Sequence, residues 1–210
     1  MVLTLSEILQ KATKEHWSTG HFNASELDQM RAIVEACQEV GAPALIGMSE
    51  GERKHFGLAE AVAVRDVMRK EHTIPIFLNA DHSKSVETAK AAIDAGFDSA
   101  HIDLSEKPFE ENVAGTKEVV EYVRSQLPTP NSQLFTVEGE LGYLKGESKV
   151  QKEKIEVSVD DYTKPEQAVE FVARTGVDRL AIMVGNIHGI SLDEPNLDIE
   201  RIRQIRQAIP

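Results

Sequence analysis

The segment IPIFLNADHSKSVETAKAAIDAGFDSAHID, residues 74–103, decides the fold. Its first apolar run ends in an Asp-His pair at 81–82, and its second ends at Asp103. Between them lies a helical pattern that begins at Ser85 and stops at Gly96, residue types typical of a helix N-cap and a helix C-terminus. Two strands joined by a helix of this length run parallel. The segment therefore predicts a βαβ unit in which both strands end in polar side chains.

The same alternation of strand and helix continues over the rest of the chain. Further strands are predicted at 20–23, 43–48, 133–141 and 178–189, and further helices at 25–40, 58–70, 108–127, 165–176 and 197–209, after an amphipathic N-terminal helix. Residues 142–163 form a polar stretch that is too long for an ordinary connection and is typical of an active-site lid or a disordered excursion. This order predicts an α/β fold of the TIM (β/α)8 type. About six βα units are present where a closed barrel has about eight. We therefore expect a single barrel domain over residues 1–210, truncated after the sixth unit.

Size and composition exclude several classes of protein. The chain has 210 residues, of which 41% are hydrophobic and 28% charged, as is ordinary for one globular domain. A net charge of −12 argues against a nucleic-acid partner, although helix N-termini can still hold a small phosphorylated substrate. No apolar run approaches the roughly 20 residues of a membrane span, and no signal-peptide pattern opens the chain. The lone Cys37, expected to be buried, forms no intramolecular disulfide, so we expect a cytoplasmic protein without a membrane partner.

Metal-ligand side chains follow four successive predicted strands. They are Asp81 with His82, Asp103, Glu138 with Glu140, and His188. In a βα barrel the carboxyl ends of the strands carry the chemistry, because the βα-loops converge there. A neutral imidazole is a good Zn²⁺ ligand, and a neighbouring carboxylate can orient it or transfer protons. The coincidence of four such strand ends favours a metal site over isolated surface residues.

Each of these motifs also has an ordinary structural interpretation. An Asp-His pair alone is more often a turn Asp beside a surface His, and Asp103 alone is more often a helix cap. Glu138 and Glu140 give the sharper signal, because residues two apart on a strand share a face, and adjacent carboxylates repel unless a cation or a shared proton relieves them. An exposed edge strand is the alternative, but the flanking apolar residues favour burial.

Other polar residues near strand ends give weaker signals. Ser49 ends the second strand beside a glycine loop that could hold substrate, and Asn23 ends the first strand in a similar way. His101 lies two residues before Asp103, so their side chains could share a face. The remaining histidines are interpreted as strand, loop or surface residues: His16, His21, His55 and His72.

Taken together, the motifs resemble the class II, metal-dependent fructose-bisphosphate aldolases, the ketose-bisphosphate aldolase family. The resemblance rests on GHFNAS (20–25), MSEG (48–51), NADHSKS (79–85), AGFDSAHIDLSEKPFEENV (95–113), VEGELG (137–142), DYTKPEQAVEFVARTGVDRLAIMVGNIHG (161–189) and LDIERIRQI (197–205). It runs along the whole chain and implies a TIM barrel that cleaves a ketose 1,6-bisphosphate reversibly into dihydroxyacetone phosphate and a phosphorylated aldehyde. Fructose 1,6-bisphosphate, which gives glyceraldehyde 3-phosphate, is the expected substrate.

The resemblance also implies a set of metal ligands. His82 and His188 would hold the catalytic Zn²⁺ or another divalent transition metal. Asp103 and Glu140 would belong to a second or alternative cation position, with Glu138 in support. The ion would act as a Lewis acid on the ketone oxygen, so no Schiff-base lysine is needed.

The resemblance implies further roles in proton transfer and substrate binding. Asp81 would be the acid/base at the aldehyde carbonyl, and Gly189 would contact the triose phosphate. The family places a proton-abstracting Glu in the loop after the fifth strand. Glu147 lies near that place, although an ungapped count puts Ser148 there instead.

The resemblance leaves part of the family's site outside this chain. The family's third metal histidine lies in an HGGSG-like segment on the seventh strand and its phosphate-binding residues lie on the eighth, whereas this sequence ends before both. A catalytic Zn²⁺ has about three protein ligands, so we expect the remainder from a complementing chain, a homo-oligomer or a longer gene product. The alternative is a non-catalytic homologue that binds metal or sugar phosphate only. In either case, an incomplete barrel is expected to expose two strand edges and an apolar interior, which invite pairing.

Overall fold

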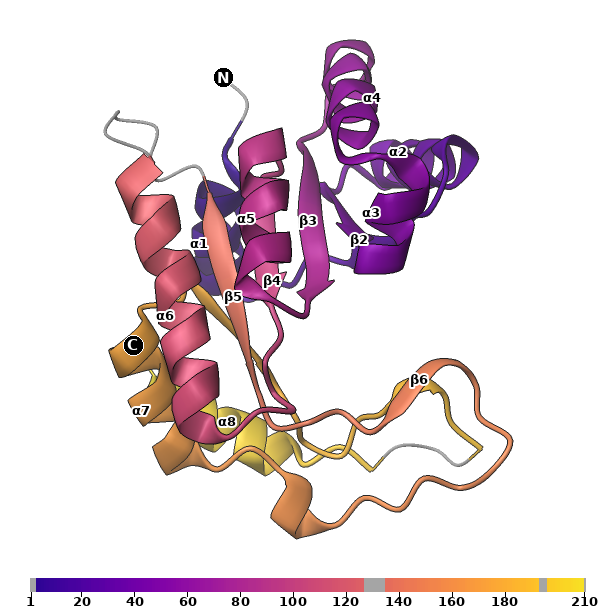
Figure 1. Ribbon diagram of the computed structural model, residues 1–210. Coiled ribbons are helices and arrows are strands. Elements are labelled where there is room, and N and C mark those ends of the chain that lie inside the picture. Colours follow the sequence, from indigo (N-terminus) through magenta and orange to yellow (C-terminus); the bar gives the residue numbers. More distant parts are fainter. Residues whose placement is uncertain (1–2, 127–134, 193–195, 210) are drawn as a thin grey trace.

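The described residues form a six-stranded parallel sheet that curls into an open half-barrel (Figure 1). The computed structural model describes residues 3–126, 135–192 and 196–209. The strands lie in the order β1 (His21–Asn23), β2 (Ala44–Met48), β3 (Ile76–Ser83), β4 (Ser99–Ile102), β5 (Thr136–Leu141) and β7 (Arg179–Ile182). Each neighbouring pair runs parallel. This sheet confirms the prediction of an incomplete TIM-type barrel.

Helices connect the strands and cover the convex face of the sheet. They are α2 (Leu27–Val40), α3 (Glu50–Phe56), α4 (Leu58–Glu71), α5 (Val86–Ala95), α6 (Phe109–Gln126), α7 (Pro165–Thr175) and α8 (Ile199–Ala208). Helices α5, α6 and α7 pack side by side, whereas α1 (Leu5–Glu15) lies behind the sheet in Figure 1. None of the helices in the described parts of the chain is long and apolar enough to cross a bilayer.

The convex face of the sheet is apolar and forms the main hydrophobic core. Four of its strand residues are fully buried: Ile46, Leu78, Ala100 and Val137. Gly139 belongs to this face, where an added Cβ atom would lie 2.7 Å from the Phe171 ring of α7. That distance is too short for any side chain, so the glycine allows α7 to approach β5 closely.

The concave face carries the residues of opposite parity. At its N-terminal end, Leu45 and Phe77 pack against Leu5 and Ile8 of α1 and form a small second core. Above this level most residues of that parity are polar, apart from Gly47 and Ala181: Asn79, Asp81, Ser99, His101, Thr136, Glu138, Glu140 and Arg179. The expectation of an apolar interior is therefore wrong above α1. Helix α1 covers the apolar end of the concave face. The rest of that face carries polar groups that can bind water or ligands.

A β-bulge in β3 brings Asp81 and His82 to the same side of the sheet. The register between β3 and β4 shifts between Ala80 and Ser83, where β3 contains one extra residue. In a regular strand, consecutive side chains would point to opposite faces. Here His82 adopts a left-handed backbone with φ of 42°. The bulge therefore allows two consecutive residues to serve one site.

The region after β5 is more ordered than its polar sequence suggests. It contains β6 (Gly146–Val150) and a 3₁₀ helix at Val159–Asp161. Strand β6 pairs with β8 (His188–Ile190) in a second, two-stranded sheet that lies away from the barrel body (Figure 1). The single strand predicted at 178–189 is thus two strands, β7 and β8, and the backbone turns between them at Gly185, whose φ is 106°. Residues 127, 133 and 134 of the predicted elements lie outside the described residues.

Ser85 caps the helix that separates the two strands of the opening βαβ unit. Its hydroxyl accepts a hydrogen bond from the Thr88 amide at 3.2 Å, and the Thr88 hydroxyl lies 3.3 Å from the Ser85 amide, which completes a capping box. We expect Ser85→Ala to lower the free energy of unfolding by about 1 kcal/mol, because the helix loses its N-cap. Urea denaturation measures this loss. The matched control is Ser125→Ala, an exposed serine in the last turn of α6, which should change the stability by less than about 0.5 kcal/mol. An equal effect of both substitutions would contradict the capping role.

Candidate metal centre and active site

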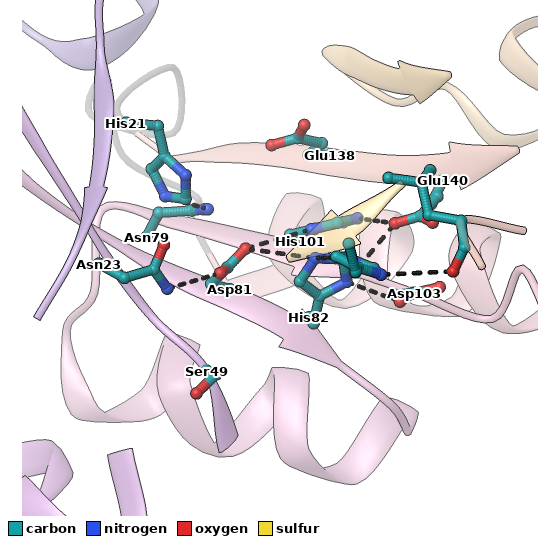
Figure 2. A network of polar contacts seen from close by, with 12 residues as sticks. His21, Asn23, Ser49, Asn79, Asp81, His82, His101, Asp103, Glu138 and Glu140 are labelled. Carbon is teal, nitrogen blue, oxygen red and sulfur yellow. Dashed lines mark hydrogen bonds and ion pairs between the residues drawn. The ribbon is translucent and has the colours of Figure 1, made fainter. Parts of the chain in front are cut away.

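The ligand-type side chains predicted from the sequence gather at the carboxyl ends of β3, β4 and β5 (Figure 2). Asp81 and His82 come from the bulge in β3, Asp103 follows β4, and Glu140 lies on β5. His188 begins β8 and reaches the same group from the second sheet. Parallel strands end at a common edge, so residues far apart in the sequence meet there.

The His82 ring is oriented by two carboxylates. Its Nδ1 lies 2.7 Å from Asp103 Oδ2 and 3.5 Å from Glu140 Oε2. Carboxylates only accept hydrogen bonds, so we assign the proton of a neutral ring to Nδ1. The other nitrogen, Nε2, then presents a lone pair. A carboxylate on one nitrogen and a free lone pair on the other is the arrangement of a metal-binding histidine.

His188 presents the matching nitrogen. Its Nε2 lies 3.3 Å from Nε2 of His82, while its Nδ1 lies 3.3 Å from the Leu144 carbonyl oxygen and donates to it. The two Nε2 atoms therefore face each other with lone pairs, which is unfavourable unless a proton or a cation lies between them. With Zn–N bonds of about 2.0–2.1 Å, two nitrogens of a tetrahedral site are about 3.4 Å apart. The pair thus fits a shared divalent ion.

Asp81 is held beside this pair as a charged carboxylate. Its Oδ2 accepts a hydrogen bond of 2.9 Å from Asn23 Nδ2, and its Oδ1 lies 3.5 Å from His101 Nδ1 and 4.0 Å from His82 Nε2. Burial alone would raise the pKa of Asp81. The contact with His101, the nearby His82 ring and the Asn23 amide outweigh that effect and hold the pKa well below its usual range.

Comparison with known proteins shows the family to which the chain belongs. The family model described as "Fructose-bisphosphate aldolase class-II" matches residues 3–210. The chain belongs to this family.

Individual relatives agree with this assignment. The chain is 35% identical over 208 residues to a fructose-bisphosphate aldolase of Geobacillus stearothermophilus, covering 98% of this chain and 69% of the relative. It is 36% identical over 207 residues to that of Staphylococcus aureus, covering 97% and 68%. The crystal structure of the YdjI aldolase from Escherichia coli K12 superposes with a TM-score of 0.81 at 30% identity, covering 100% of this chain and 70% of that one.

His101 is more central to the candidate site of this aldolase homologue than the sequence indicated. It is buried between two carboxylates, with Nδ1 facing Asp81 and Nε2 lying 3.0 Å from Glu140 Oε2. The second contact is an ion pair and not a well-directed hydrogen bond. Burial lowers the pKa of His101, but the contacts with Asp81 and Glu140 outweigh it and raise the pKa above its usual range. The sequence signal for His101 was that it lies two residues before Asp103, so the two side chains could share a face of the sheet.

Asp103 and Glu140 lie on the Nδ1 side of the His82 ring, opposite the nitrogen that faces His188. Asp103 Oδ1 accepts from the Ser105 amide at 3.2 Å and from the Ser105 hydroxyl at 2.6 Å, and its Oδ2 also accepts from Lys84 Nζ at 2.6 Å. The Ser105 hydroxyl lies 3.3 Å from Glu140 Oε1. Burial raises the pKa of Asp103, but the hydrogen bonds from His82, Lys84 and Ser105 outweigh it and hold that pKa far below its usual range.

Within the described residues, two side-chain groups could hold a metal ion: Asp81 with His82 and His101, and His82 with Asp103 and Glu140. Glu138 is in neither group. Its carboxylate lies 3.1 Å from Arg179 NH1, one level deeper in the half-barrel. Figure 2 likewise shows Glu138 without a contact to the other labelled side chains. A supporting role for Glu138 in metal binding therefore remains a prediction.

The predicted substrate-binding residues occupy different places. Asn23 joins the network through Asp81, whereas Ser49 lies apart from it in Figure 2. The Ser49 side chain caps α3 by accepting from the Glu52 amide. Gly189 follows His188 with an exposed backbone at φ of 83°. The side chains of Glu147 and Ser148 lie outside the described part of the chain. Their strand is nevertheless next to the site, because Gly146 of β6 pairs with His188 of β8.

Proposed function

We propose that the chain carries out the reversible aldol cleavage of a ketose 1,6-bisphosphate, with fructose 1,6-bisphosphate as the substrate and dihydroxyacetone phosphate and glyceraldehyde 3-phosphate as the products. Family membership supports the reaction class. The single observation that carries the proposal is the pair of facing Nε2 atoms of His82 and His188, 3.3 Å apart beside the Asp81 carboxylate.

His82 and His188 would hold the divalent ion, with Zn²⁺ as the proposed species. Their nitrogen donors suit that metal, and both rings have an oxygen acceptor on the opposite nitrogen. An ion bound there supplies Lewis-acid polarisation of the substrate ketone oxygen.

Asp81 is the proposed acid/base at the carbon–carbon bond that breaks. In the cleavage direction its carboxylate takes the proton from the hydroxyl group that becomes the aldehyde carbonyl, and in condensation it returns that proton. Its low pKa keeps it ionised at neutral pH, and Asn23 and His101 fix its position. Glu147 on β6 is the proposed second proton-transfer group, which acts at the carbon of the triose half.

We also propose that Gly189 contacts a phosphate group of the substrate and that the chain assembles with a further copy or a complementing chain. Gly189 has an exposed backbone that a phosphate can approach without meeting a side chain. The outer strands of the described sheet, β1 and β7, each have one edge without a neighbouring strand, which supports a homo-oligomer or a complementing chain. The buried Cys37 is compatible with the proposed cytoplasmic location.

Metal removal tests the proposed function. The purified chain is assayed for bound zinc and for cleavage of fructose 1,6-bisphosphate, before and after treatment with a chelator. We expect turnover that the chelator abolishes and that added Zn²⁺ restores, because the polarising ion is lost and regained. Turnover that persists at full rate after complete metal removal would overturn the metal-dependent mechanism. Bound metal without turnover would leave a metal-binding aldolase homologue and overturn the catalytic proposal.

A further inference from the structure

Asp103 has no vacant lone pair for a cation. A carboxylate has about four lone-pair positions, and four donors already lie on this one. The His82 ring and the Lys84 ammonium share Oδ2, and the Ser105 amide and hydroxyl share Oδ1, at distances of 2.6–3.2 Å. A metal ion could coordinate Asp103 only by displacing one of them.

Glu140 also lies among groups of the protein, at longer distances. Its Oε2 lies 3.0 Å from His101 Nε2 and 3.5 Å from His82 Nδ1, and its Oε1 lies 3.3 Å from the Ser105 hydroxyl. Its side chain is almost fully buried. The two carboxylates expected to bind a second cation are thus already paired with groups of the protein itself.

Lys84 supplies the fixed positive charge of this arrangement. Its Nζ lies 2.6 Å from Asp103 Oδ2 and 3.6 Å from Glu106 Oε1. The Lys84 side chain is about half exposed (47%), whereas the Asp103 side chain is almost fully buried. An ammonium group is a compact point charge that can take the place of a small cation among carboxylates.

We propose that Lys84 is a built-in counter-cation: its ammonium occupies the second cation position of the site and keeps Asp103 bound to Nδ1 of His82, so the chain takes a single divalent ion at His82 and His188. This inference rests on the proposed metal centre. Lys84 acts through Asp103 and His82, and is therefore a positioning residue.

Removing the ammonium should open the second position to a metal. Without it, Asp103, Glu106 and Glu140 have less positive charge near them, and their oxygen atoms suit a hard ion such as Mn²⁺. The chain is first loaded with Zn²⁺, and Mn²⁺ binding is then followed by electron paramagnetic resonance. We expect Lys84→Met to bind about one Mn²⁺ more per chain than the wild type. Lys84→Arg keeps the positive charge and should bind like the wild type.

A second lysine provides the matched control. Lys90 forms a comparable ion pair of 2.7 Å with Glu118, away from the site, so Lys90→Met should not change Mn²⁺ binding. The proposal is overturned if Zn²⁺-loaded wild type already binds the additional Mn²⁺, or if Lys84→Met binds no more than the wild type. The difference between variant and wild type tests Lys84, whereas the zinc content of the wild type tests the proposed metal centre. The two failures are therefore distinguishable.

Discussion

Replacing His82 by Ala is expected to lower the affinity of the chain for Zn²⁺ by more than about 100-fold. Loss of a residue that only hydrogen-bonds to a metal ligand already costs about 10–100-fold, and loss of the ligand itself should cost more. His82 supplies one of the two nitrogens that face each other at 3.3 Å, and it is also the residue shared by both groups of potential ligands. Competition with a chromophoric chelator measures the affinity. Circular dichroism and urea denaturation of the same samples show whether the variant is folded.

An exposed histidine provides the control for this experiment. His55 lies on the surface of α3, and His55→Ala should bind Zn²⁺ like the wild type. His188→Ala should resemble His82→Ala. If folded His82→Ala retained the wild-type affinity, the ion would be bound elsewhere and the assignment of the facing pair would be wrong.

Asp81→Asn should lower kcat for cleavage of fructose 1,6-bisphosphate by a factor of about 10²–10⁴, the usual contribution of a positioned acid/base. The amide has the same shape and can keep a hydrogen bond with Asn23, but it cannot accept the substrate proton. We expect the zinc content to stay unchanged, because the ion is assigned to His82 and His188. Steady-state kinetics and metal analysis of the same preparation separate the two effects.

The control for Asp81→Asn is Asp28→Asn, an exposed carboxylate at the start of α2. Its kcat should equal that of the wild type. A wild-type kcat in Asp81→Asn would show that another group transfers this proton. A loss of bound zinc together with activity would instead place Asp81 among the metal ligands, next to His82 and His101 as one of the two potential groups allows.

Most of the architecture was predictable because strands and helices have different hydrophobic periods. The opening βαβ unit is present as expected, with Ser85 and Gly96 as the caps of α5. The carboxyl ends of β3, β4 and β5 meet, which brings Asp81, His82, Asp103 and Glu140 together. The pattern could not reveal β6 and β8, because the second sheet consists of short strands whose partners are far apart in sequence.

The parts of the site that escaped prediction depend on contacts that only the folded chain creates. The sequence indicated Asp81 and His82 as a pair, but a period of two places consecutive residues on opposite faces, and only the bulge shows how both reach one site. Spacing allowed His101 to share a face with Asp103 but did not show that it lies between Asp81 and Glu140. Lys84 carries no sequence signal for its contact with Asp103.

The bulge also places two opposing effects on stability at residue 82. The left-handed backbone there, with φ of 42°, suits glycine, and a side chain in that conformation costs about 1–2 kcal/mol. His82→Gly would relieve this strain, but it would also remove the Nδ1 donor from the buried Asp103 carboxylate, which costs a comparable amount. Selection for thermal stability alone would therefore neither strongly keep nor strongly remove His82, and directed evolution would need a metal-binding screen at every round to keep this proposed metal ligand.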